Sequence, residues 1–228
     1  MDIELAQYNW IERLPEPVKV SVRGCMTARH YVAGEVVYRT GDPGDELYQL
    51  VSGNIRLYTV DPKGRELLYI IHQAGNCFGE MSLIDNLPRA HIAQAIGETE
   101  LCVMRRRQFE QLWMLYPEIS RELCRLLCSR ERSMFGVFED RSLLPLPARI
   151  AIRLYQLAST LGTEQRDGIH FDLRITQEDI SLMVAASRQA VNKVLKDWQG
   201  EGIIDISYGN FIVKDLQALK ILCTSSET

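Results

Sequence analysis

The sequence predicts an α+β protein in which an antiparallel β sandwich or barrel precedes a long helix and a C-terminal winged helix-turn-helix. Three observations support this fold class. Between residues 27 and 110, glycine- and aspartate-rich turns separate short apolar runs about every 8–12 residues, which is typical of antiparallel sheets. From Gln108 to about Arg141, apolar residues recur at helical spacing. Residues 175–206 indicate two short helices ahead of a β-hairpin.

Composition limits the class of protein. The chain has 228 residues, of which 46% are hydrophobic and 25% charged, a balance that allows a buried core. No apolar run is long enough to span a membrane, and the N-terminus lacks a basic-then-apolar signal pattern. We therefore expect a cytoplasmic protein. Because the net charge is −4, any nucleic-acid site must be a local patch.

The six cysteines are dispersed, which argues against a disulfide framework in a chain of this size. Cys124 and Cys128 lie four residues apart, on one face of the predicted long helix. We expect both to be small buried residues, with metal binding or redox sensing as the alternative. We expect no metal site.

The long helix carries one apolar stripe. Pro117 suits its first turn, because proline is pre-organised for that position. We expect the stripe to form a dimer interface, and the alternative is that it packs on its own domain. The stripe consists of Ile119, Leu123, Leu126, Leu127, Met134 and Phe138.

Proline and glycine mark a turn and a hinge. The segment 41–44, Gly-Asp-Pro-Gly, is predicted to be a tight turn between strands. Pro145 and Pro147 end the long helix and form a hinge. Beyond this hinge we predict a helix over 148–161, a polar loop over 162–168 and a short strand over 170–175.

The two helices near the C-terminus have the features of a helix-turn-helix. Thr176 can cap the first helix, with Asp179 completing a capping box. Ala185 stands at the tight corner, where glycine is usual, and a positive φ there would cost an alanine about 1 kcal/mol. Ser187 can cap the second helix. The strands that follow are predicted to meet around residues 208–210 as a wing.

The solvent face of the second helix has three cations and no anion between Ser187 and Lys196. A recognition helix needs such a face, because its side chains must reach base edges and phosphates in the major groove. Arg188 can donate two hydrogen bonds to guanine. The alternative is a solvated face in a winged-helix module that binds protein. The predicted DNA-binding residues are Thr176, Ser187, Arg188, Gln189, Asn192, Lys193 and Lys196.

The stretch FGEMSLIDNLPRAH, residues 78–91, places one acid and one base on either side of a short turn. Gly79 allows a close approach of the backbone. Arg89 offers a planar, permanently charged donor, and Glu80 offers a carboxylate acceptor. We interpret them as a binding pair. Because no Ser/His/Asp order, P-loop or metal triad occurs, we expect no enzyme.

Over nearly its whole length the chain resembles the catabolite-activator/Fnr (Crp–Fnr) family of bacterial transcription regulators. SRQAVNKVLK, residues 187–196, is similar to the family's recognition helix, and FGEMSLIDNLPRA is similar to the phosphate-binding cassette of cyclic-nucleotide domains. The resemblance implies an N-terminal antiparallel β-roll (double-stranded β-helix or jelly-roll) over 1–115, a dimerisation helix over 116–142 and a winged helix-turn-helix over 143–228. It also implies a homodimer through helix 116–141, a palindromic operator in double-stranded DNA, and RNA polymerase as a partner.

The resemblance also implies an effector. In that family the cassette glutamate accepts a hydrogen bond from the ribose 2′-hydroxyl and the arginine pairs with the cyclic phosphate, roles that fall on Glu80 and Arg89. A cyclic nucleotide, cyclic AMP first, is the implied effector. Arg188 falls on the family's guanine-reading arginine, and Gln189 falls on a glutamate. The implied ligand-binding residues are Gly79, Glu80, Met81, Ser82, Arg89, Ala90, Arg130, Met134 and Phe135.

The base-reading half of the implied site departs from the family. Met134 and Phe135 stand where the long helix otherwise offers a threonine and a serine to adenine, although Phe135 could stack on a base. The alternatives left open are a small aromatic or organic acid, haem, and no ligand, with Glu80 and Arg89 paired to each other. The candidate haem ligands are His72, Cys77 and His91.

Overall fold

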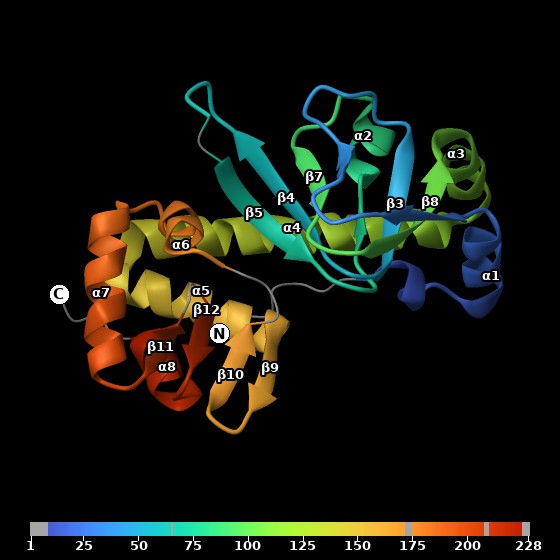
Figure 1. Cartoon of the computed structure of the whole chain (residues 1–228). Coiled ribbons are helices and arrows are strands. Elements are labelled where there is room, and N and C mark those ends of the chain that lie inside the picture. The colour runs from blue at the N-terminus through green and yellow to red at the C-terminus, as the bar shows by residue number, and fades with distance from the viewer. Residues whose placement is uncertain (1–8, 65, 172–174, 208–209, 225–228) are drawn as a thin grey trace. The chain divides into compact units, whose positions relative to one another are not determined.

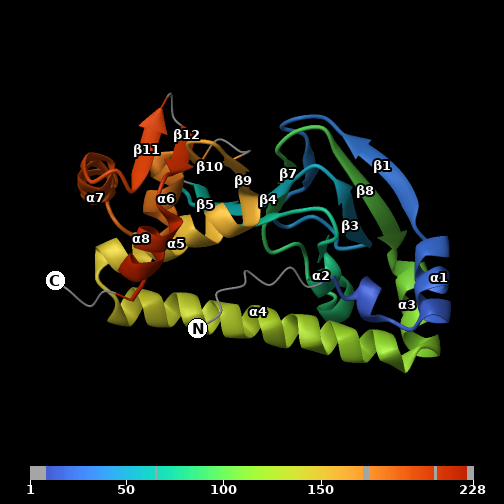
Figure 2. The same ribbon diagram turned by 90° about the horizontal axis from the view of Figure 1, so that it is seen from below.

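The computed structural model describes residues 9–64, 66–171, 175–207 and 210–224 (Figure 1). The chain forms two compact units, the first ending at Arg132 and the second beginning at Ser133. Helix α4 (Pro117–Leu143) runs through this boundary as one uninterrupted helix (Figure 2). Among the described residues, no helix combines the length and the apolar character that a membrane crossing requires.

The first unit is built on two four-stranded antiparallel sheets, which confirms the predicted α+β fold with an antiparallel β-roll. One sheet has the order β1-β8-β3-β6, with strands Thr27–Tyr31, Thr99–Arg105, Glu46–Ser52 and Cys77–Phe78. The other has the order β2-β7-β4-β5, with strands Val36–Tyr38, Ile92–Ala95, Ile55–Val60 and Glu66–His72. Strand β7 buries Ala93 and Ala95 and strand β8 buries Leu101 and Val103, alternate positions of the kind that one-sided antiparallel sheets bury.

Two hydrophobic clusters fill this unit. The first lies on the inner faces of the strands and includes Leu50, Ile55, Phe78 and Leu101. The second is formed by the 3₁₀-helix η1 (Ile11–Arg13) and by helices α1 (Glu16–Gly24), α3 (Arg106–Leu115) and α4, and includes Trp10, Val22, Phe109, Ile119 and Leu123. The sequence did not predict α1. Tyr116, with extended φ and ψ of −123° and 97°, separates α3 from α4, so Pro117 starts α4 as predicted.

The stripe of α4 divides into two parts. Ile119, Leu123 and Leu126 are buried in the core of the first unit, so this part packs on its own domain. Met134 and Phe138, in the second unit, are 72% and 69% exposed. The expectation that the whole stripe faces a partner is therefore wrong for its first half.

The prediction that Cys124 and Cys128 are buried is also wrong, because both side chains are exposed. The face of α4 that packs on the first unit is the one with Ile119, Leu123 and Leu126, and the two cysteines lie beside that face. Helical spacing alone shows which residues share a face but not which face a core covers.

The second unit contains four helices besides the end of α4 and one four-stranded antiparallel sheet of order β11-β12-β10-β9 in the residues that the structure describes. The helices are α5 (Leu146–Leu161), α6 (Gln177–Met183), α7 (Arg188–Gly200) and α8 (Leu216–Leu222). The strands are β9 (Gly162–Gln165), β10 (Gly168–Phe171), β11 (Ile204–Ser207) and β12 (Asn210–Val213).

The polar loop predicted over 162–168 is instead a hairpin of β9 and β10. Strand β9 is at the edge of the sheet and exposes Thr163, Glu164 and Gln165, so it shows no apolar alternation that a sequence could reveal. The strand predicted over 170–175 ends at Phe171 within the described residues, and its residues 172–174 lie outside them. Residues 208 and 209 of the predicted wing tip also lie outside the described residues.

Candidate functional site

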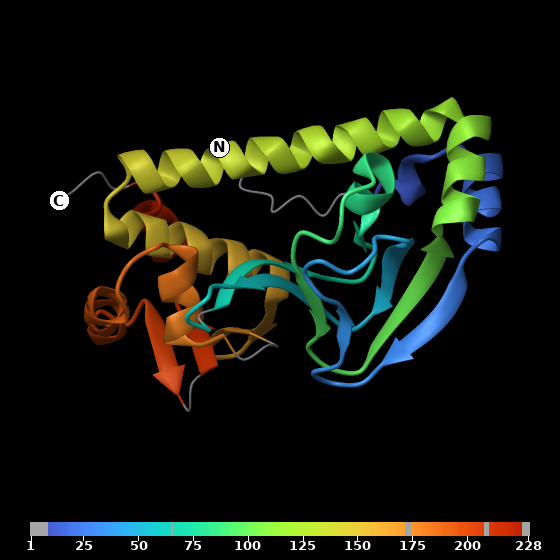
Figure 3. The same ribbon diagram turned by 90° about the horizontal axis from the view of Figure 1, so that it is seen from above.

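The cassette, defined as residues 78–90, is built around the short helix α2 (Glu80–Asp85), which lies beside α4 (Figure 3). Gly79 precedes this helix with φ of +87°. A Cβ atom at Gly79 would lie 2.9 Å from Arg89 Nη1 and 3.0 Å from the carbonyl oxygen of Glu46. Both the positive φ and the close contacts require glycine at this position. Asn86, with φ of +61°, ends the helix.

Arg89 is a buried cation with no carboxylate partner among the described residues. Its side chain is 3% exposed and donates to the carbonyl oxygens of Gly79 at 2.7 Å and Glu46 at 2.6 Å. Its guanidinium carbon lies 4.4 Å from the centre of the Tyr38 ring, a cation–π contact. The Nε donor has no acceptor in the described part of the chain. Since carbonyls and a ring compensate a buried charge only in part, the position favours an anion.

Glu80 is fully buried and pairs with Arg130 of α4. Arg130 also donates to the carbonyl oxygen of Cys77 at 2.9 Å. The second carboxylate oxygen of Glu80, Oε2, has no hydrogen-bond partner among the described residues. A buried acceptor of this kind favours a hydroxyl donor. The alternative in which Glu80 and Arg89 pair with each other is wrong, because the acid pairs with Arg130.

His72, at the end of β5, is buried and neutral. Burial is the main cause that lowers the pKa of its imidazole from 6.5 to about 3, and the nearby charge of Arg130 adds to the effect. Its Nδ1 lies 3.2 Å from Asn76 Oδ1, which also accepts from the backbone N–H of Gln73. Nδ1 is therefore the donor, and Nε2 is an acceptor without a partner in the described residues.

The three candidate haem ligands lie in different environments, His72 and Cys77 buried and His91 half-buried. Burial raises the pKa of the Cys77 thiol far above its usual value, which disfavours the thiolate that binds iron. His91 is half-buried, and burial lowers the pKa of its imidazole. Among the described residues, no group of three or more His, Cys, Asp or Glu side chains converges as a metal site.

The remaining ligand-binding residues predicted from the sequence lie in different environments. Ser82 is buried in α2, whereas Met81 and Ala90 are exposed. Met134 and Phe135 belong to the second unit and are 72% and 58% exposed.

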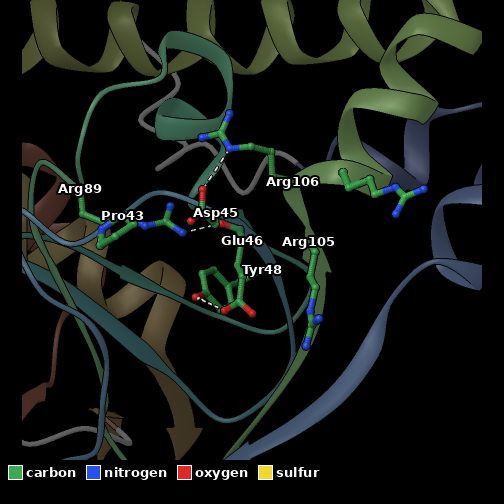
Figure 4. Close-up of a pocket in the computed structure, with 8 residues that line it drawn as sticks. Pro43, Asp45, Glu46, Tyr48, Arg89, Arg105 and Arg106 are labelled. Atoms are coloured by element: carbon green, nitrogen blue, oxygen red, sulfur yellow. Dashed lines mark hydrogen bonds and ion pairs between the residues drawn. The ribbon is translucent and has the colours of Figure 1, made fainter.

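Sequence reasoning missed several side chains around Arg89. Tyr48 donates its hydroxyl hydrogen to Glu46 Oε2 at 2.8 Å, and Arg29 binds both oxygens of the same carboxylate at 2.9 and 3.0 Å. These hydrogen bonds, that of Arg29 first, lower the pKa of Glu46. A pocket of about 330 Å³ opens here, and Figure 4 shows Arg89 pointing toward Glu46 within it. Its lining is Pro43, Asp45, Glu46, Tyr48, Arg89, Arg105, Arg106 and Arg107.

The helix-turn-helix is formed as predicted. Thr176 and Asp179 make a reciprocal capping box, with Thr176 Oγ1 accepting from the Asp179 N–H at 3.1 Å and Asp179 Oδ2 accepting from the Thr176 N–H at 2.8 Å. Ser187 caps α7 by accepting from the N–H of Ala190 at 3.2 Å. Ala185, at the corner between α6 and α7, has a positive φ of +50°, the conformation in which alanine is less favourable than glycine.

Helix α7 presents a polar face to solvent and an apolar face to the core. Val191, Leu195 and Trp198 are buried. Asn192 is partly exposed, and Arg188, Gln189, Lys193 and Lys196 are exposed. In the described part of the chain, the three cations on this face have no ion-pair partner, so their charges are available to a polyanion.

Comparison with known proteins matches both parts of the chain. The family model of the cyclic nucleotide-binding domain matches residues 28–116, and that of the Crp-like helix-turn-helix domain matches residues 148–222. A CRP-like cAMP-activated global transcriptional regulator of Mycobacterium tuberculosis is 34% identical over 82% of this chain and 83% of its own length. A cyclic AMP receptor protein of Thermus thermophilus is 28% identical over 90% of this chain and 92% of its own length.

A solved structure agrees with these matches. A CRP/FNR-family transcriptional regulator of Thermus thermophilus superposes with a TM-score of 0.75 at 26% identity, covering 88% of this chain and 100% of that one.

Proposed function

The chain belongs to the Crp–Fnr family of effector-responsive, DNA-binding transcription regulators, and we propose that its effector is a cyclic nucleotide, cyclic AMP first, bound by the cassette. The observation that carries the proposal is a buried arginine without an acidic partner in the described residues, close to a buried glutamate with one unused oxygen. A cyclic phosphate supplies the anion that Arg89 lacks, and a ribose hydroxyl supplies the donor for Glu80 Oε2. The named activities of the relatives from Mycobacterium and Thermus support the same ligand class.

The proposed site residues have separate tasks. Arg89 neutralises the phosphate, Gly79 allows the ligand to approach the backbone, and Ser82 holds α2 against the neighbouring turn. Glu80 accepts from the ribose and is held in place by Arg130. The proposed set of ligand-binding residues also contains Met81, Ala90, Met134 and Phe135.

The base is expected to be recognised differently. The thioether of Met134 and the ring of Phe135 offer contact area and stacking but no hydrogen bonds that distinguish adenine from guanine. We therefore expect a smaller difference between cyclic AMP and cyclic GMP affinity than polar groups at these positions would give. The second candidate is a small organic acid, which the same buried Arg89 favours, because its charge suits any compact anion.

Isothermal titration calorimetry of the wild type with cyclic AMP, cyclic GMP and buffer alone tests the effector. Binding is expected for at least one nucleotide. Arg89→Leu is expected to abolish binding. Arg121→Leu removes an exposed charge of α4 outside the pocket beside Arg89 and should leave the affinity within about twofold of the wild type, well below a tenfold change of about 1.4 kcal/mol. If the wild type binds neither nucleotide, the cyclic-nucleotide proposal fails and the organic acid becomes the leading candidate.

The second part of the proposal concerns DNA. We propose a sensor domain over 1–115, a dimerisation helix over 116–142 and a DNA-binding domain over 143–228. A homodimer through α4 would place two α7 helices in successive major grooves, with half-sites of a palindromic operator about 34 Å apart. The exposed apolar side chains of Met134, Phe135 and Phe138 support an α4 interface. Since its target is the chromosome, the proposed place of action is the cytoplasm, with RNA polymerase as a partner.

Effector binding would change the equilibrium between two arrangements of the DNA-binding domains. The proposed hinge is the connection between α4 and α5, where Pro145 caps α5 with extended backbone angles and Pro147 occupies its first turn. Such a shift needs an effector that binds one arrangement more tightly than the other. Fluorescence anisotropy with a selected palindromic operator tests the DNA half, since binding by the α7 cations should weaken steeply as salt rises. An affinity that did not depend on salt would favour a protein-binding winged helix.

A further inference from the structure

Arg106, the first residue of α3, has an acceptor for each of its five side-chain N–H groups. Its Nε donates to Asp45 Oδ1 at 3.0 Å, its Nη1 to Leu83 O at 3.3 Å and Asn86 Oδ1 at 2.7 Å, and its Nη2 to Gly44 O and Ser82 O, both at 2.9 Å. Only a guanidinium group carries five donors in one fixed plane. Lysine at this position could satisfy at most three of the five acceptors.

The five acceptors belong to two segments that are far apart in the sequence. Ser82 and Leu83 lie in the middle of α2, and Asn86 caps the end of this helix, which is part of the cassette. Gly44 and Asp45 belong to the turn 41–46, which leads into β3. Arg106 therefore joins α2 to this turn, as Figure 4 shows for its bond to Asp45.

The same turn holds Arg89. The backbone N–H of Gly41 donates to the carbonyl oxygen of Arg89 at 2.8 Å, and the N–H of Arg89 donates to the carbonyl oxygen of Asp42 at 2.9 Å. At the other end of the turn, the carbonyl oxygen of Glu46 accepts from Arg89 Nη2 at 2.6 Å. The main chain and the side chain of Arg89 are thus both fixed by the turn 41–46.

The turn and α2 are in direct contact at Gly44 and Ser82. A Cβ atom at Gly44 would lie 1.9 Å from Ser82 Cβ, so no side chain fits between the two segments. Glu80 lies in the first turn of α2, and Arg89 is held by the turn 41–46. The separation of these two ligand-binding groups therefore depends on how α2 and the turn are joined.

We propose that Arg106 is a positioning residue of the effector site, which fixes α2 to the turn 41–46 and so holds Glu80 and Arg89 at the spacing that a ribose phosphate requires. This inference rests on the proposed function of the cassette. Arg106 would not touch the effector. It keeps Glu80 and Arg89 in place before the ligand binds. This lowers the entropic cost of ordering their side chains on binding.

Two substitutions of Arg106 and one matched control test the proposal. Arg106→Met and Arg106→Lys are expected to weaken binding of the cyclic nucleotide by about tenfold or more in calorimetry, a change of about 1.4 kcal/mol or more. Arg121→Met removes the same charge from an exposed position of α4 that does not line the pocket beside Arg89, and should change the affinity by about twofold at most. Gly44→Ala leaves Arg106 intact but forces the turn away from Ser82, so it should weaken binding as well.

A second measurement is independent of the ligand and of overall stability. Amide hydrogen exchange in Arg106→Met should be faster in residues 79–90, while the ladder between β4 and β5 in the same protein keeps its wild-type protection and serves as the internal reference. Faster exchange together with weaker binding supports a positioning role. Wild-type exchange in 79–90, or faster exchange with wild-type affinity, would overturn the proposal.

The two measurements also separate this inference from the proposed function. If the wild type binds no cyclic nucleotide, the effector assignment fails by itself, and the exchange of residues 79–90 still shows whether Arg106 holds the cassette. If Arg106→Met does not fold, the decision rests on Gly44→Ala and Arg106→Lys. Wild-type affinity and exchange in both would refute the role.

Discussion

The buried imidazole of His72 makes the stability of the first unit depend on pH. Its pKa is about 3 in the folded protein and 6.5 in an unfolded reference, chiefly because burial disfavours the charged form. The unfolded chain therefore takes up a proton between these pH values and the folded chain does not. Because the folded pKa is depressed, the stability contribution is complete above about pH 6.5 and is lost as the pH falls toward 3. One such group changes the free energy of unfolding by about 1.4 kcal/mol per pH unit, which amounts to about 2 kcal/mol between pH 7 and pH 5.

His72→Gln removes the titration and keeps a neutral polar group beside Asn76. Its stability should fall less than that of the wild type between pH 7 and pH 5, by the same amount of about 2 kcal/mol. Comparing the two proteins cancels the contributions of other groups, including His91, whose pKa is also lowered by burial.

Urea denaturation at pH 5, 6 and 7 measures this difference. The chain has three tryptophans, and Trp198→Phe in both proteins would leave only Trp10 and Trp113, which report on the first unit. Parallel dependences of stability on pH in the two proteins would refute the reasoning, because His72 would then titrate as it does in the unfolded chain.

Three further substitutions have defined outcomes. Ala185→Gly should stabilise the second unit by about 1 kcal/mol in chemical denaturation, since Ala185 has φ of +50°, and a loss of stability would contradict the backbone assignment. Leu123→Ala should cost about 2–5 kcal/mol in the same assay, because Leu123 is 2% exposed in the core, and a cost near zero would place it at a surface. Arg188→Ala should cost about 1–3 kcal/mol of operator binding at one base pair and relax specificity there, whereas unchanged discrimination in a set of mutated operators would rule out direct reading by Arg188.

The helix-turn-helix could be predicted closely because its signals are local. The capping box of Thr176 and Asp179 joins residues three positions apart. The tight turn at Ala185 is predicted because few residues separate the apolar pattern of the first helix from that of the second. The cassette is likewise local, because Gly79, Glu80 and Arg89 all lie within one short stretch of the sequence. Such features depend on a few neighbouring residues, so a sequence shows them directly.

The contacts of the cassette could not be predicted, because they join distant segments. Arg130 reaches Glu80 across 50 positions, and Arg106 reaches Gly44 across 62. The spacing of residues along the sequence does not show which of these distant side chains are in contact. Glu80 therefore has a partner, Arg130, that only the packing of α4 beside α2 supplies.

Exposure along α4 was mispredicted for the same reason. Cys124 and Cys128 share a face and are small and apolar, which is typical of buried residues. Which face of the helix is covered depends on the core of the first unit, where Trp10 and Phe109 pack against Ile119. Those neighbours come from the N-terminal segment and from α3, and the helical periodicity does not contain them.

The most direct test of the account is the affinity for a selected operator with and without saturating cyclic nucleotide, measured by fluorescence anisotropy at one fixed salt concentration. An effector that shifts two arrangements of the DNA-binding domains should change the dissociation constant by about 5–150-fold, and Arg89→Leu should remove this change while keeping the affinity of the unliganded protein. Equal operator affinity in the presence and absence of a nucleotide that calorimetry shows to be bound would contradict the coupling between the cassette and DNA recognition.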